Sequence, residues 1–198
     1  MKLYISTASP FARKCRVVAR EKGLAARVEE TVADPYANDP ALLAANPVVQ
    51  VPTLIAEDGL PLTDSPVICE YLDALGAGPR LLPEAGPERL RVRRIETLAN
   101  GALEMGVKLV LEKRRPESER SPSWMARWTT NMGRALDALE AAGPNPDDLH
   151  MGTVTAAVAA TWIGFRHPDY DWAGGRPRLV ALREALEARP SFRETFPA

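Results

Sequence analysis

Residues 76–88 divide the chain, because three glycines and three prolines occur among these thirteen positions. Proline removes a backbone donor and glycine is conformationally free, so neither a continuous helix nor a strand is expected to run through this stretch. Hydrophobic spacing also differs on its two sides: the period changes several times before it, whereas a helical period persists after it. The sequence therefore predicts two domains, residues 1–76 and 88–198, joined by a linker at 77–87.

The first domain alternates short strands and short helices. Residues 3–5 are an apolar strand candidate, and Ser9 followed by Pro10 begins a helix that Gly23 ends. The turn at 57–59 separates two short strands, which makes these strands neighbours and antiparallel. The other elements predicted here are strands at 27–32, 51–55 and 60–62 and helices at 40–45 and 65–75. The resulting order is β-α-β-α-β-β-α.

The second domain keeps the spacing of helices throughout. Residues 151–165 are apolar nearly all round, which is typical of a helix at the centre of a bundle. We expect the large apolar side chains in both domains to lie in the core, among them Val67, Trp124, Trp128 and Trp162. The helices predicted are 88–114, 121–142, 151–165 and 179–188. The predicted fold class is an α/β domain followed by an all-α helical bundle domain.

Composition excludes several classes of protein. Twenty-five Lys and Arg against 26 Asp and Glu give a net charge of -1, so no whole-molecule field attracts nucleic acid or an anionic membrane surface. Two cysteines and two histidines, all well separated, are too few for a structural zinc site or a disulfide framework. No apolar run suits a signal peptide or a membrane span. We therefore expect a cytoplasmic protein that needs no metal.

Three short motifs in the first domain are able to carry chemistry. Ser9 before Pro10 is typical of a helix N-cap, and backbone N–H groups at a helix N-terminus attract anions. Asp64, Ser65 and a following proline repeat that arrangement. Val51–Pro52 begins a strand, where proline indicates a sheet edge, a bulge or a cis bond that frees backbone groups for a bound peptide. For each motif taken alone, simple capping or an ordinary trans proline is the favoured explanation.

Taken together, the motifs resemble the glutathione transferase family. The segments that carry the resemblance are Ser9–Lys14, Asn46–Leu54 and Asp64–Ile68, all within one β-α-β-α-β-β-α unit. The resemblance extends over the whole chain and implies a thioredoxin-like first domain that binds glutathione and an all-helical second domain. It further implies a homodimer whose co-substrates are glutathione and a small hydrophobic electrophile.

The resemblance assigns roles to particular residues. Ser9 would stabilise the glutathione thiolate, and the backbone of Val51, before a cis Pro52, would pair with the cysteinyl residue of glutathione. Asp64 and Ser65 would hold the γ-glutamyl end. Gln50 would reach the glycyl end, although many relatives carry a lysine nearby, which leaves that contact open. The residues expected to line the pocket for the electrophile are Phe11, Met105 and Leu109.

Other interpretations of the same sequence stay open at this point. The chain is also compatible with a binding or interaction module without turnover, or with a glutathione-dependent isomerase or dehalogenase. Cys15 lies six residues beyond Ser9 and about 240° around the helix, which favours a core thiol. Tyr4 is expected to pack within the sheet. His150 stands where the family usually has a helix-capping Ser or Thr, so Asp147 or Asp148 is expected to supply that cap.

Overall fold

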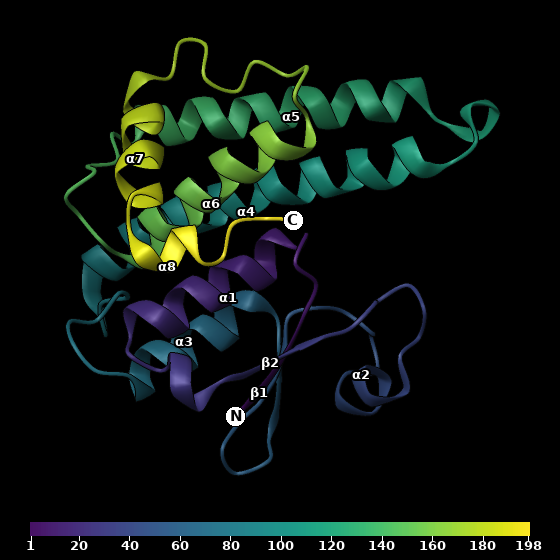
Figure 1. The fold of residues 1–198 in the computed structure, drawn as a ribbon. Helices are drawn as coiled ribbons and strands as arrows, with labels where there is room; N and C mark the ends of the chain where they lie inside the picture. The colour runs from purple at the N-terminus through teal and green to yellow at the C-terminus, as the bar shows by residue number, and fades with distance from the viewer. The chain divides into compact units, whose positions relative to one another are not determined.

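The computed structural model describes all residues 1–198 and divides them into two compact units (Figure 1). The first unit comprises residues 1–82 and 189–198, and the second comprises 83–188. The predicted helical domain of 88–198 includes the last ten residues, whereas in the structure they pack with the first unit. Residues 77–82, predicted as linker, pack there as well.

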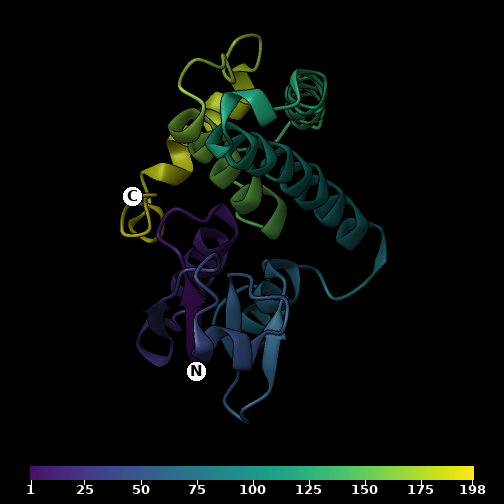
Figure 2. The same ribbon diagram turned by 90° about the vertical axis from the view of Figure 1, so that its right-hand side faces the viewer.

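The first unit is built on a four-stranded mixed sheet, whose arrows are seen in Figure 2. Its strands are β1 (Lys2–Ile5), β2 (Glu29–Val32), β3 (Thr53–Ile55) and β4 (Pro61–Thr63), in the order β2-β1-β3-β4. β1 and β2 are parallel, whereas β1 with β3 and β3 with β4 are antiparallel, as predicted for the last pair. β2 begins later than predicted because Ala25–Arg27 form a 3-10 turn.

Helices α1 (Pro10–Glu21) and α3 (Ser65–Leu75) pack side by side (Figure 1), while α2 (Pro40–Ala45) lies against β3. The prediction that Val67 belongs to the buried stripe of α3 is wrong, since this side chain is 50% exposed. Ile68 and Leu72 form the buried face. Val67 precedes Ile68 by one residue, which turns it about 100° away on a helix of 3.6 residues per turn.

A buried ion pair attaches residues 77–82 to the first unit. Lys22 Nζ lies 3.1 Å from Asp73 Oδ1, and each side chain is only 1% exposed. The Asp73 carboxylate also accepts the backbone N–H groups of Leu81 and Leu82, at 2.9 and 3.0 Å, and Lys22 Nζ donates to the carbonyl of Pro79 at 2.8 Å. These bonds, which satisfy both buried charges, are the physical reason that the segment is not a free linker.

The second unit is a bundle of α4 (Gly86–Arg114), α5 (Pro122–Ala141), α6 (Met151–Arg166) and α7 (Pro177–Glu187). Residues 151–163 of α6 are all buried, as predicted for a central helix, and α6 packs on α4 and α7. No helix of the chain is both long and apolar enough to cross a membrane.

The expectation that Trp124 lies in the core is wrong, since this side chain is 53% exposed. The buried residues of α5 are confined to 132–139, so its first turns extend beyond the part of the helix that its neighbours cover. Trp124 instead stacks on Trp128, with ring centroids 5.8 Å apart. Trp162 is buried, as predicted.

His150 itself caps α6, which corrects the expectation that Asp147 or Asp148 would do so. The Nδ1 atom of His150 accepts the Thr153 N–H at 3.1 Å, and the Thr153 hydroxyl oxygen accepts the His150 N–H at 3.0 Å. Asp148 contributes only its carbonyl, which accepts the Thr153 hydroxyl at 2.7 Å. A neutral imidazole has one unprotonated nitrogen, so histidine completes a capping box only while it is uncharged.

This cap predicts a stability that depends on pH. Burial lowers the pKa of His150 below its ordinary value, against the opposing effect of Asp148 and Glu88, so the folded chain binds this proton less readily than the unfolded chain. The contribution is therefore complete above about pH 6.5, the ordinary histidine value, and is lost as the pH falls through the lower folded value. We expect the free energy of unfolding to fall by about 1 kcal/mol, the typical worth of an N-cap, between pH 7.5 and pH 5.

Urea unfolding of the parent chain and of His150→Asn at both pH values measures this effect. Asparagine caps a helix without titrating. The variant therefore removes only the titration of residue 150 and keeps the other acid-sensitive groups, including His167. An equal loss of stability on acidification in the two proteins would contradict the prediction.

Candidate functional site

The register of the sheet brings the three predicted motifs to one edge. Tyr4 pairs with Thr53 across β1 and β3, and Thr53 pairs with Thr63 across β3 and β4. The chain leaves β1 toward Ser9 at this edge, enters β3 from Pro52 and leaves β4 toward Asp64, because antiparallel neighbours place their opposite ends together. The motif at Ser9, more than forty residues before the other two, thus joins them in one candidate site.

Ser9 is the N-cap of α1, as predicted. Its Oγ accepts the backbone N–H of Ala12 at 3.2 Å, and Pro10 occupies the first turn, where a missing N–H costs nothing. The side chain is half-buried, and its own hydroxyl proton has no acceptor within the chain. Ser9 therefore lies where the partial positive charge of α1 is greatest and retains one proton to donate.

The peptide bond between Val51 and Pro52 is cis, which confirms one of the alternatives that the sequence left open. Neither the N–H nor the C=O of Val51 is hydrogen-bonded within the chain, so both are available to an extended ligand. Val51 packs with Tyr4 in the cluster under this loop. Tyr4 is buried, as predicted, and Gln50 is exposed beside the cis bond.

Asn46 organises the loop that presents Val51, a role that the sequence did not predict, although Asn46 begins one of the segments that carry the family resemblance. Its buried side chain donates from Nδ2 to the carbonyl of Gln50 at 3.2 Å and to Thr53 Oγ1 at 3.0 Å, while its Oδ1 accepts the Val48 N–H at 3.0 Å. The sequence shows only an asparagine before a proline, which is typical of an ordinary turn. The hydrophobic pattern does not reveal that this amide is buried and hydrogen-bonded.

Asp64 and Ser65 begin α3. Asp64 is the N-cap with φ 68°, a left-handed conformation that turns the chain sharply into the helix, and its carboxylate makes no capping bond. Ser65 is 1% exposed, yet its Oγ has no hydrogen-bond partner in the chain. A buried hydroxyl without a partner is uncommon in a folded protein and costs about 1–3 kcal/mol, so Ser65 Oγ is a group to which a ligand can bond.

Comparison with known proteins decides the family. Residues 8–75 match the family model described as "Glutathione S-transferase, N-terminal domain". Over 201 aligned residues the chain is 36% identical to the "Uncharacterized GST-like protein YibF" of Escherichia coli (strain K12), covering 100% of this chain and 98% of that one. The chain belongs to the glutathione transferase family. Its thioredoxin-like first domain and helical second domain are those expected of this family.

Two further relatives are similar to this chain over its whole length. A solved glutathione transferase family member from Pseudomonas fluorescens Pf-5, with bound glutathione, superimposes with a TM-score of 0.95 at 32% identity and covers 100% of this chain and 98% of that one. The maleylacetoacetate isomerase of Pseudomonas aeruginosa is 27% identical over 213 residues, which cover 100% of this chain and 96% of the relative.

The two cysteines of the chain do not belong to the candidate site, and no cluster of metal-binding side chains adds to it. Cys15 and Cys69 are buried side by side, with their Sγ atoms 3.7 Å apart. Burial raises the pKa of Cys15 well above its ordinary value, and the adjacent Cys69 raises it further, so Cys15 stays a protonated core thiol, as predicted. No three or more histidine, cysteine or carboxylate side chains lie together as a metal site would require.

The residues predicted to line the electrophile pocket belong to different units. Phe11 is half-buried on α1 of the first unit. Met105 is half-buried and Leu109 is buried on α4 of the second unit. Their contribution to one pocket stays a prediction.

Proposed function

We propose that this chain is a glutathione transferase in which Ser9 activates the thiol of bound glutathione for attack on a small hydrophobic electrophile. The observation that carries the proposal is the common sheet edge, at which a hydroxyl with a free proton, an unpaired backbone segment and a buried hydroxyl without a partner come together. Glutathione offers a matching set of groups: a thiol, a peptide backbone and a carboxylate with an ammonium group.

The energetic demand on Ser9 is modest. A thiol of pKa about 8.5 is only about 3% ionised at pH 7, and lowering that pKa by about two units requires roughly 2.7 kcal/mol. A hydrogen bond to a charged acceptor contributes about 1.5–3 kcal/mol and a helix N-terminus about 0.3–1 kcal/mol. The hydroxyl proton of Ser9 and the N-terminus of α1 therefore suffice to hold the thiolate without a metal.

The remaining parts of glutathione find groups on the other two loops. In the proposal the N–H and C=O of Val51 pair with the cysteinyl residue as an added strand would. Ser65 Oγ and the N-terminus of α3 bind the γ-glutamyl carboxylate, and Asp64 takes the ammonium group beside it. Gln50, exposed next to the cis bond, reaches the glycyl end. These groups bind the substrate, whereas Ser9 changes its ionisation.

Titration with glutathione tests the proposal directly. Calorimetry at neutral pH measures binding, and the ultraviolet absorbance of the thiolate measures ionisation of the bound sulfur. We expect saturable binding of one glutathione per chain together with a thiolate signal. Binding without that signal would remove the activating role of Ser9, and absence of binding would leave an interaction module.

Ser65→Ala is expected to weaken glutathione binding about tenfold, the worth of one hydrogen bond to a charged group, without destabilising the fold. Its hydroxyl has no partner to lose in the free chain, so the free energy of unfolding should stay constant or rise. Calorimetry measures the first effect and urea unfolding the second.

Thr53→Val is the matched control for Ser65→Ala. Thr53 is also a buried hydroxyl at this sheet edge, but its Oγ1 is bonded to Asn46 and to the carbonyl of Gln50. We therefore expect this variant to be less stable by about 1–3 kcal/mol, because it leaves buried polar groups unpaired. A loss of stability in Ser65→Ala as large as in Thr53→Val would contradict the role assigned to Ser65.

A second candidate function is a glutathione-dependent isomerase. The observation in its favour is the full-length similarity to the maleylacetoacetate isomerase of Pseudomonas aeruginosa, at 27% identity. The same thiolate serves both reactions: it stays on the product of a transferase and leaves the product of an isomerase. Mass analysis of the products of an electrophile panel, looking for retained glutathione, distinguishes the two.

The proposal includes a cytoplasmic homodimer, as the family resemblance implies. Sedimentation equilibrium would then give twice the chain mass of 21.6 kDa. Phe11, Met105 and Leu109 complete the proposal as the wall of the electrophile pocket.

A further inference from the structure

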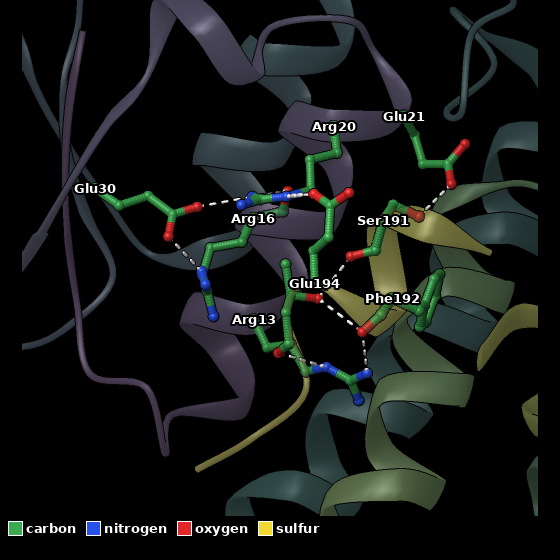
Figure 3. A network of polar contacts seen from close by, with 9 residues as sticks. Arg13, Arg16, Arg20, Glu21, Glu30, Ser191, Phe192 and Glu194 are labelled. Carbon is green, nitrogen blue, oxygen red and sulfur yellow. Dashed lines mark hydrogen bonds and ion pairs between the residues drawn. The ribbon is translucent and has the colours of Figure 1, made fainter. Parts of the chain in front are cut away.

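Residues 189–198, here called the 189–198 segment, run antiparallel along α1 within the first unit. At the end of α1, the Glu21 carboxylate accepts hydrogen bonds from Nε and Nη2 of Arg189, at 2.8 and 2.7 Å, and from the Ser191 hydroxyl. One residue earlier on α1, Arg20 donates from Nε to the Glu194 carboxylate at 3.0 Å. Figure 3 shows α8 (Pro190–Arg193) lying beside α1, with the labelled side chains of Arg20, Ser191 and Glu194 between them. The segment was predicted as part of the helical domain, so its contacts to α1 were not foreseen.

Arg13 makes the central contact of the 189–198 segment. Its side chain is 1% exposed and donates from Nε to the carbonyl of Thr195 at 3.1 Å and from Nη2 to the carbonyl of Phe192 at 3.0 Å. The guanidinium also lies 5.5 Å from the ring centroids of both Phe192 and Phe196. Two carbonyls and two aromatic faces thus replace water around a buried charge, which suits the planar, multiply donating guanidinium and not an ammonium group.

The contacts of the segment continue past Arg13 to the loop before α1 and so flank Ser9. Thr7 Oγ1 donates to the carbonyl of Ala198 at 3.3 Å, two residues before Ser9. Arg13 lies four residues after it, and the Arg13 N–H donates to the Ser9 carbonyl at 2.9 Å. Between these anchors the Ser9 N–H closes a tight turn on the carbonyl of Ser6 at 3.0 Å. The backbone that carries the Ser9 hydroxyl is therefore held on both sides by the same segment.

We propose that the 189–198 segment positions the Ser9 hydroxyl, with Arg13 as the positioning residue that couples the segment to the first turn of α1. The inference rests on the proposed role of Ser9 in holding the thiolate. A hydrogen bond to a thiolate weakens steeply when its angle or length departs from the best geometry, so a looser turn lowers the ionisation of the sulfur. The groups assigned to the rest of glutathione lie on the other two loops, so affinity depends on them.

Two variants and one control test the proposal in the full chain. Arg13→Met removes the donors to Phe192 and Thr195 and keeps an apolar stem. Thr7→Val removes only the exposed anchor on the other side of Ser9 and serves if Arg13→Met folds poorly. Glu21→Gln weakens the attachment of the same segment at the far end of α1, more than two helical turns beyond Arg13. Each protein is measured by the pH dependence of thiolate absorbance with bound glutathione, by glutathione affinity, and by hydrogen exchange in residues 6–13.

In Arg13→Met we expect the pKa of bound glutathione to rise by about one unit, which lowers the rate at pH 6.5 about fivefold by reducing the thiolate fraction. Its glutathione affinity should change less than threefold, and exchange in residues 6–13 should accelerate at least tenfold. Thr7→Val should show the same pattern to a smaller degree. Glu21→Gln should loosen residues 189–193 while leaving the thiol pKa as in the parent.

The outcomes separate this inference from the proposed function. If the parent chain forms no thiolate, the role of Ser9 fails, and the exchange measurement still decides whether Arg13 holds the turn. If the parent forms the thiolate and Ser9→Ala abolishes it, an unchanged thiol pKa in both Arg13→Met and Thr7→Val overturns the inference. Unchanged exchange in residues 6–13 of Arg13→Met overturns it as well. An equal pKa rise in Glu21→Gln would show general loosening of the fold instead of positioning, and would also overturn it.

Discussion

Ser9→Ala is expected to lower kcat/KM about 50-fold near pH 6.5, because the pKa of bound glutathione returns toward that of the free thiol, a rise of about two units that reduces the thiolate fraction by that factor. Affinity for glutathione should change little, since the groups assigned to its backbone and γ-glutamyl end are untouched. The loss should shrink as the pH approaches about 9, where the free thiol ionises without help. The measurement is a pH profile of kcat/KM together with thiolate absorbance.

Ser121→Ala is the matched control for this substitution. Both serines are helix N-caps whose Oγ accepts an N–H three residues on, from Ala12 at 3.2 Å and from Trp124 at 3.4 Å. Each replacement should therefore destabilise its helix by about 1 kcal/mol, the typical worth of a cap. Only Ser9→Ala should raise the thiol pKa. A pH profile unchanged by Ser9→Ala would refute the assignment of this residue.

Asp73→Ala is expected to destabilise the chain by about 3–5 kcal/mol, the usual effect of removing one partner from a buried ion pair. The substitution leaves the Lys22 ammonium buried without its counter-charge and leaves the N–H groups of Leu81 and Leu82 without acceptors. Urea unfolding followed by circular dichroism measures the loss. Limited proteolysis should cut within residues 77–82, because their attachment to the first unit is gone.

The exposed pair Arg91 and Glu88 is the control for the buried pair. Its atoms approach to 2.8 Å, closer than the 3.1 Å of the buried pair, but both side chains lie largely in solvent. Glu88→Gln should therefore cost no more than about 0.5 kcal/mol. Equal losses of stability from Glu88→Gln and Asp73→Ala would mean that burial does not make the Lys22–Asp73 pair more important to stability than an exposed pair.

Much of the fold follows from local patterns along the chain. Helix α2 occupies the predicted residues 40–45, and α1 and α6 agree with their predicted ranges to within about two residues. In each case a capping residue and proline begin the helix, or an apolar stretch supplies its buried faces. The strand at 27–32 was placed less well, because its alternation is weak and its first residues make a 3-10 turn instead.

Errors arose where burial depends on contacts distant in sequence. Val67 and Trp124 are apolar and correctly spaced for a core, yet both are exposed because no neighbouring element covers them within their unit. Lys22, Asp73 and Arg13 are charged, yet all three are buried. A charged side chain enters the interior only when specific partners replace water around it, and those partners lie elsewhere in the chain.

The amino-acid sequence by itself determined the order of elements, the Ser9 cap, the proline after Val51 and the Ser65 helix start, because each depends on residues a few positions apart. Only the tertiary structure decided that the three loops share one sheet edge, that Ser65 Oγ lacks a partner and that residues 189–198 join the first unit. The physical reason is that strand register and buried polar bonds couple residues far apart in sequence, 49 positions from Tyr4 to Thr53 and 182 from Arg13 to Thr195, and no local pattern encodes such pairs.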